Sequence, residues 1–285
     1  MKNSFRFLAV AIAVMLLFPA CNKEGKYTPK KKISRIESSV TNSLGTSITE
    51  IEEWEWDGDL LSKITYKFGD GEIYSITKFQ YGSDKRVESL NVVADSYTAK
   101  YEFVYEGKDL VKITRKESGA EDVDVYTFKK ENGKVVEISL TEAASKSSAD
   151  ANILMYILPY DVAKCIKPSG SKASTTYKLI WDGKNVARLE AYAGGVLVME
   201  SGWTYDDKIN PLAGLYSDNS IYSKEEIYSA NNVLASYMTV QVMGIENTVY
   251  HAFAYEYDGK YPVERTWESE NLGMVTGHKQ TIHYK

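Results

Sequence analysis

Three histidines, the residues that most often carry protons or bind metals near neutral pH, all lie near the end of the chain. His251 shares its strand parity with Phe253 and Tyr255, while His278 and His283 follow in the last stretch. Neighbouring strands can bring such residues together, but no acidic residue stands at a spacing typical of a metal-binding motif. We therefore expect isolated strand histidines, with no metal site and no cofactor.

Acidic residues are plentiful, and two carboxylates that flank a glycosidic bond form the usual catalytic pair of a glycoside hydrolase. The candidates are adjacent pairs, Glu52-Glu53, Asp206-Asp207 and Glu225-Glu226. Adjacent residues of a strand point to opposite faces, so a pair of this kind cannot act on one bond. The sequence also lacks the nucleophile, phosphate-binding and dinucleotide-binding motifs. We predict that the protein is not an enzyme; a hydrolase with carboxylates from separate strands is an alternative.

Aromatic residues are the one surplus that suggests binding, since the chain has 22 tyrosines and 5 tryptophans. Aromatic faces bind sugars and other amphipathic ligands, although aromatic residues are also ordinary strand formers and core fillers. The tyrosines that fall outside the main apolar parity are the candidate ligand-binding residues: Tyr160, Tyr192, Tyr216 and Tyr222.

The beginning of the chain has the pattern of an export signal. Lys2 and Arg6 precede an apolar run that ends at Phe18, and this run is too short to span a bilayer as a helix. The ending Phe18-Pro19-Ala20-Cys21 resembles the lipobox of bacterial lipoproteins, with Phe18 where Leu is usual. That resemblance implies a signal peptide over residues 1–20 and lipidation of Cys21, and ordinary secretion is the alternative.

A lipidated Cys21 would hold the protein to a membrane, because each acyl chain contributes about 0.8 kcal/mol per buried CH2. Asn22 in place of Asp favours the outer membrane by family resemblance, and Lys23-Glu24 leaves open whether the protein faces the periplasm or the cell surface. Residues 21–32 contain several lysines around Pro29 and are predicted to form a flexible tether. This tether could touch anionic head groups or serve as a solvated spacer.

The remaining composition is that of a folded domain, with 44% hydrophobic residues. The net charge of -5 comes from 34 basic and 39 acidic residues that are mixed along the chain. Such mixing argues against nucleic-acid binding and favours solubility.

A short pattern recurs along residues 33–285 and defines the expected elements. An aromatic, any residue and a second aromatic precede a turn such as Asp57-Gly58, Asp182-Gly183 or Asp258-Gly259. The repeat distance is about 24 residues, which fits two strands and two short turns, that is, one β-hairpin. Trp54 and Trp56 share the apolar parity of their hairpin and are expected in the core.

Sequential hairpins with one apolar face cannot remain an exposed flat sheet. We predict an all-β fold of roughly 14 to 16 strands, an antiparallel up-and-down meander that closes into a barrel or a strongly curled sheet. A membrane-spanning barrel is the alternative, but its aromatic residues would gather in girdles at the two interfaces and not in the middle of the strands.

Two stretches interrupt the repeat. Residues 143–166 have helical spacing before Pro159, and Ser223–Ser229 could form a second short helix because Ser223 can cap it. These insertions could cover an edge or mouth of the sheet, or act as a lid over a ligand. If the protein has a localised functional site, we expect it at residues 143–173 and 209–232.

The hairpin pattern also carries a resemblance. The units Trp54-Glu55-Trp56-Asp57-Gly58 and Tyr255-Glu256-Tyr257-Asp258-Gly259 resemble YD-type repeats. The segment from Tyr205 to Leu212 is similar to the Tyr-Asp…Asn-Pro segment of an uncharacterised bacterial lipoprotein family, the domain of unknown function numbered 4595. The resemblance covers residues 33–285 and implies a porin-like, many-stranded lipoprotein with no known activity and no catalytic residues.

Taken together, these features predict a lipid-anchored envelope protein that binds a ligand without catalysis, with a glycan as the candidate ligand. The alternative is a structural or assembly partner that docks onto another envelope protein through a sheet edge or the helical insertions.

Overall fold

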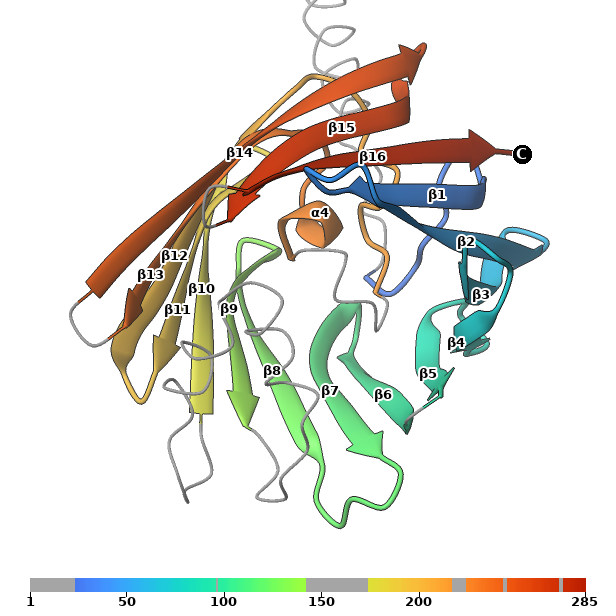
Figure 1. Ribbon diagram of the computed structural model, residues 1–285. Coiled ribbons are helices and arrows are strands. Elements are labelled where there is room, and N and C mark those ends of the chain that lie inside the picture. Colours follow the sequence, from blue (N-terminus) through green and yellow to red (C-terminus); the bar gives the residue numbers. More distant parts are fainter. Residues whose placement is uncertain (1–23, 96, 142–173, 217–223, 243–244, 272–273) are drawn as a thin grey trace, which may run out of the picture.

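The computed structural model describes residues 24–95, 97–141, 174–216, 224–242, 245–271 and 274–285. Its 16 strands form a closed barrel in which each strand pairs antiparallel with its neighbours in sequence. The barrel closes where β1 pairs with β16 (Figure 1). The predicted all-β meander is therefore confirmed, with closure into a barrel.

The strands are joined mostly by short turns, so the wall follows the order of the sequence. The strands are β1 Ile33–Thr41, β2 Ser47–Asp57, β3 Leu60–Phe68, β4 Ile73–Tyr81, β5 Val87–Ala94, β6 Thr98–Glu106, β7 Asp109–Glu117, β8 Asp124–Glu131, β9 Lys134–Thr141, β10 Ser174–Asp182, β11 Asn185–Ala193, β12 Val196–Tyr205, β13 Val233–Val242, β14 Ile245–Asp258, β15 Tyr261–Asn271 and β16 Met274–Tyr284. One short helix, α4, spans Lys224–Tyr228.

The two sides of the wall differ in chemistry because alternate residues of a strand face opposite sides. Trp54 of β2 points inward and is buried. Its neighbours Glu53 and Glu55 point outward. There, Glu55 pairs with Lys63 at 2.5 Å and Glu53 pairs with Lys67 at 2.6 Å. The core thus lies inside the barrel, and charged cross-strand pairs cover its outside.

In most repeats the second aromatic stands at a β-bulge, where an extra residue leaves a carbonyl without its ladder partner. The register shifts at Trp56 and again at Tyr81. The Tyr81 hydroxyl donates to the carbonyl of Leu61, which is the residue opposite Trp56, at 2.7 Å. Tyr81 thus satisfies the bulge of the preceding hairpin. The residues that donate in this way, which we call the aromatic latches, are Trp56, Tyr81, Tyr105, Trp181, Tyr205, Tyr255 and Tyr284.

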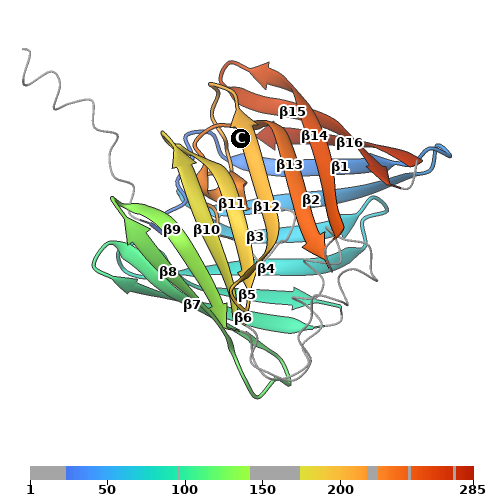
Figure 2. The ribbon, with the colours of Figure 1, turned by 90° about the vertical axis from the view of Figure 1, so that its left-hand side faces the viewer.

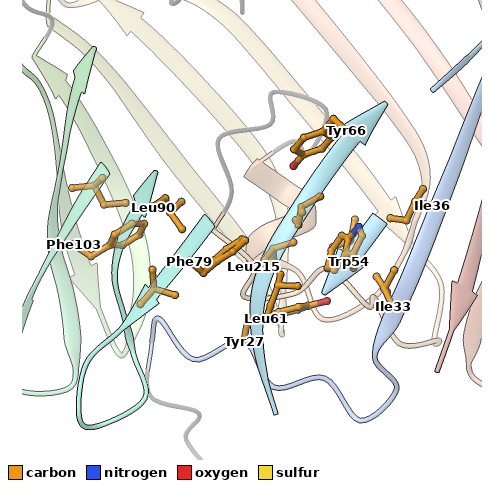
Figure 3. Close-up of a cluster of buried hydrophobic side chains, with 14 of the residues drawn as sticks. Tyr27, Ile33, Ile36, Trp54, Leu61, Tyr66, Phe79, Leu90, Phe103 and Leu215 are labelled. Carbon is orange, nitrogen blue, oxygen red and sulfur yellow. The ribbon is translucent and has the colours of Figure 1, made fainter. Parts of the chain in front are cut away.

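One mouth of the barrel is filled from within by the β12–β13 connection, which contains α4 (Figure 1). Leu212 and Leu215 of this connection are buried against the inner wall. Side chains from many strands converge on them (Figure 3). We call this end the plugged mouth, and it carries the turns after β2, β4, β6, β8, β10, β12 and β14.

Residues 24–32 belong to the plug, which corrects the flexible tether predicted for 21–32 in its described part. Tyr27 is only 2% exposed, stacks on Trp56 with ring centroids 5.9 Å apart, and donates its hydroxyl to the Pro211 carbonyl at 2.6 Å. The sequence pattern did not predict the burial of Tyr27 because this residue lies outside the repeat. Its partners come from distant parts of the chain.

The predicted interruptions of the repeat have different outcomes. The helix expected at Ser223–Ser229 is present as α4. The helix expected at 143–166 lies outside the described residues. In the part of the chain that the structure describes, no helix is long and apolar enough to cross a bilayer. Figure 2 shows the wall from the side of β9 to β13.

Candidate ligand site in the barrel lumen

A row of aromatic rings lies on the inner face of β14, β15 and β16. Cross-strand pairing places Phe253 opposite Trp267, and Trp267 opposite His278. The Trp267 and His278 rings are stacked, with centroids 4.7 Å apart and planes 5° from parallel, and the Phe253 ring lies 5.7 Å from Trp267. All three side chains are partly exposed. The row therefore offers an accessible aromatic surface to the lumen.

The row is connected to the plug through Arg265. Its guanidinium carbon lies 5.4 Å from the centroid of Phe253 and 4.9 Å from that of Trp267, which are cation–π distances. The same guanidinium forms an ion pair with Glu226 of α4, and both side chains are almost fully buried. Charge attraction to Glu226 raises the pKa of Arg265 despite its burial. The aromatic row is thus held against a fixed cation.

Polar groups border the row. The Ser269 hydroxyl and His278 Nε2 are 2.8 Å apart, and His251 lies beside Phe253 with centroids 6.3 Å apart. Burial lowers the pKa of His251, and burial together with the charge of His251 lowers the pKa of His278. Both imidazoles are therefore neutral at pH 7, and a neutral imidazole both donates and accepts hydrogen bonds.

This arrangement suits the binding of a ligand that has apolar faces and hydroxyl edges. Sugar rings have both, since their C–H faces can pack on Trp267 while hydroxyls bond to Ser269 or an imidazole. No group of three or more potential metal ligands occurs among the described residues. The geometry favours binding by stacking and hydrogen bonds.

The histidine expectation is partly corrected by this geometry. His251 and His278 both face the lumen and are close enough for the charge of one to lower the pKa of the other. They are therefore not isolated, as the sequence predicted. His283 alone faces outward, where its Nε2 lies 3.4 Å from a carboxylate oxygen of Glu37.

The candidate tyrosines do not form a shared patch in the described structure. Tyr192 is on the outer face, where its hydroxyl donates to Glu190 at 2.8 Å. Tyr216 is in the plug, where its ring makes edge contacts with Phe103 and Tyr228, and burial raises its pKa well above the usual value. Tyr160 and Tyr222 lie outside the described residues.

Two of the adjacent carboxylate pairs separate, Glu52-Glu53 on β2 and Asp206-Asp207 just after the end of β12. Glu52 is buried and accepts a hydrogen bond from Trp54 Nε1 at 3.1 Å, while Glu53 is on the outer face. Asp206 accepts the Tyr257 hydroxyl at 2.5 Å, and Asp207 pairs with Lys208 at the surface. The carboxylates therefore work as structural partners in these positions.

The same part of the wall has a shallow groove of about 740 Å³ on its outer face. Its lining is made mostly of outward residues with small side chains, such as Ala252, Ala254 and Gly277. Tyr250, on the same strand and the same face, is 74% exposed.

Two solved structures have a similar fold. A porin-like protein from Bacteroides uniformis matches with a TM-score of 0.55 and 11% sequence identity, over 92% of this chain and 100% of that chain. A porin-like protein from Bacteroides vulgatus matches with a TM-score of 0.48 and 10% identity, over 90% of this chain and 99% of that chain. No family model and no curated protein matches the sequence. At this level of identity the likeness shows the fold alone, a porin-like barrel.

Proposed function

We propose that this protein is a lipid-anchored envelope barrel that binds a glycan in its lumen without catalysis. The observation that carries the proposal is the inner row of Phe253, Trp267 and His278, with Ser269 beside it. A stacked surface bordered by neutral hydrogen-bonding groups is the chemistry that recognises sugar rings. Its position inside the barrel would enclose part of a bound chain.

The chemistry of the outer wall favours a barrel that is surrounded by water and not by lipid. Charged residues occur along its strands, among them the Glu55–Lys63 and Glu53–Lys67 pairs. A lysine or arginine at the middle of a lipid-facing strand costs about 2 to 4 kcal/mol. A wall with such residues on many strands suits an aqueous compartment better than a bilayer. The membrane attachment in this proposal comes from a lipid on Cys21.

The proposed anchor follows from the resemblance of Phe18-Pro19-Ala20-Cys21 to a lipobox. The resemblance to domain of unknown function 4595 points in the same direction, since that family consists of lipoproteins. On this proposal the protein is held at the outer membrane. Mass spectrometry of the N-terminal peptide from the purified protein tests it, because lipidation would place acyl chains on Cys21.

Glycan binding is tested with the purified full-length protein on an array of cell-envelope and host glycans. We expect binding that is lost in Trp267→Ala and weakened in Ser269→Ala. Tyr250→Ala is the matched control, because it removes an exposed aromatic from the outer face of the same wall. Binding that survives in Trp267→Ala, or that Tyr250→Ala abolishes equally, would overturn the lumen site.

A docking role for the same barrel is favoured by the outer groove beside Tyr250. Small side chains such as Ala252 and Ala254 would let another protein approach the wall closely. Capture from solubilised membranes, compared between the wild type and Ala254→Arg, tests this second function. If the two samples capture identical sets of partner proteins, the groove is not the docking surface.

A further inference from the structure

Among the turns that the structure describes, the two mouths of the barrel differ in charge. At the plugged mouth, four of the turns expose lysines: Lys85, Lys108, Lys184 and Lys260. At the opposite mouth, the described turns are 42–46, 69–72, 118–123 and 194–195. These turns contain no lysine or arginine, and their exposed charges are Asp70, Glu72, Glu121 and Asp122.

Acidic residues also occur at the plugged mouth, but many of them are already paired. Asp258 pairs with Lys31 at 2.6 Å, and Asp59 pairs with Lys32 at 2.8 Å. Asp84 pairs with Arg86. These pairs neutralise one another locally. The exposed turn lysines remain, together with the exposed carboxylates of Asp57, Glu106 and Asp182, as the charges that this mouth presents to its surroundings.

The first described residues are fixed to this same mouth. The Glu24 carboxylate accepts a hydrogen bond from the Leu110 backbone N–H at 2.7 Å and forms an ion pair with Lys130. The Gly25 carbonyl accepts a hydrogen bond from the Val87 N–H at 3.0 Å. Glu24 is three residues after Cys21, and three residues span at most about 11 Å. A lipid on Cys21 would therefore hold the membrane within that distance of the attachment point.

We propose that the plugged mouth is a membrane-contact surface for anionic lipid head groups, and that the opposite mouth faces away from the bilayer. The proposal rests on the proposed lipidation of Cys21. Three observations support the proposal: the short link from Cys21 to Glu24, the fixed position of Glu24 and the exposed lysines of the same mouth. Anionic head groups attract lysines near the surface, whereas the acidic turns at the opposite mouth would be repelled.

Depth-dependent quenching tests this orientation in the lipidated protein. A fluorophore is attached at Lys108→Cys in the plugged mouth or at Ser43→Cys in an exposed turn of the opposite mouth, both in a Cys165→Ser background. The protein is reconstituted in vesicles of phosphatidylcholine and phosphatidylglycerol that contain brominated lipid. We expect quenching at position 108 and none at position 43. Equal quenching at both positions, or stronger quenching at position 43, would overturn the orientation.

The role of the fixed tail is tested with Glu24→Gln combined with Gly25→Ala. A side chain at position 25 would collide with the Tyr105 hydroxyl. We expect this variant to keep the barrel fold, seen by circular dichroism, and to lose the difference in quenching between the two labels. If the folded variant keeps the full difference, the tail does not set the orientation.

The lysines are tested in Cys21→Ser protein, which has no lipid, by cosedimentation with the same vesicles. Replacing the four turn lysines by glutamine should reduce the partition coefficient by about tenfold or more. The matched control removes four exposed lysines from the outer wall: Lys78, Lys100, Lys116 and Lys129. An equal loss in the control would show that net charge, and not this mouth, drives binding. Glycan binding is measured separately, so failure of the orientation leaves the lumen site standing.

Discussion

The aromatic latches make a quantitative prediction about stability, which is sharpest for Tyr81. Tyr81→Phe removes only the hydroxyl that donates to the Leu61 carbonyl at 2.7 Å. Leu61 is fully buried, and its carbonyl lies opposite the bulge at Trp56. A buried acceptor that loses its donor costs about 1 to 3 kcal/mol. Because the latch is only partly buried, we expect the free energy of unfolding to fall by about 1 to 2 kcal/mol.

The measurement is urea unfolding followed by tryptophan fluorescence. With a denaturant slope near 3 kcal/mol/M, the midpoint should fall by about 0.3 to 0.7 M. Tyr250→Phe is the control, since it removes the hydroxyl of a side chain that is 74% exposed and should leave the midpoint unchanged. Tyr205→Phe removes a second latch, and its effect should add to that of Tyr81→Phe because the two sites share no partner. If Tyr81→Phe and Tyr250→Phe have the same midpoint, the latches do not satisfy the bulges.

Three further predictions concern the charged and titratable groups of the lumen. Arg265→Met should lower the free energy of unfolding by about 3 to 5 kcal/mol, because it leaves the buried carboxylate of Glu226 unpaired. Arg265→Met with Glu226→Gln should recover part of that loss in the same urea assay. Burial raises the pKa of Tyr255 to about 12, above its unfolded value near 10, so the folded state keeps a proton that the unfolded state loses. Stability should therefore fall from about pH 10 to pH 12, and a constant urea midpoint over this window would contradict the burial of this phenol. The lowered pKa values of His251 and His278 mean that both imidazoles stay neutral below their usual range. Glycan binding should accordingly weaken only when the pH falls below the usual imidazole range, and isothermal titration at a series of pH values checks this.

The choice of lumen residues depended on register, which the sequence indicates only in part. The alternation around Phe253 and Trp267 places each residue on the apolar face of its own strand. Counted back from the Asp258-Gly259 turn through the Tyr257–Pro262 pair, simple pairing would put Phe253 opposite Thr266. The bulge between Glu256 and Tyr257 moves the register by one residue, so that Phe253 meets Trp267. In most repeats the bulge falls beside the second aromatic, but only the structure shows that it shifts the register there.

The plug is a second feature that the sequence pattern predicts only in part. The repeat breaks at 209–232, and the described part of this stretch forms the plug. The pattern could not show that Leu212 and Leu215 enter the barrel, nor that Tyr27 completes the filling. Tyr27 bonds to Pro211 across a sequence separation of 184 residues, and a local pattern has no information about such a contact. The predicted tether failed for this reason.

By itself, the sequence determined the repeat, the hairpins, the inward parity of Trp54 and the need to cover one apolar face with a barrel or a strongly curled sheet. These follow from local rules, since strand alternation and turn chemistry act over a few residues. Only the tertiary structure decided which mouth is plugged, which bulges the latches satisfy and that His251 and His278 share the lumen with Trp267. These depend on bulges that shift the register and on contacts between distant segments, and both are fixed only when all 16 strands close on one another.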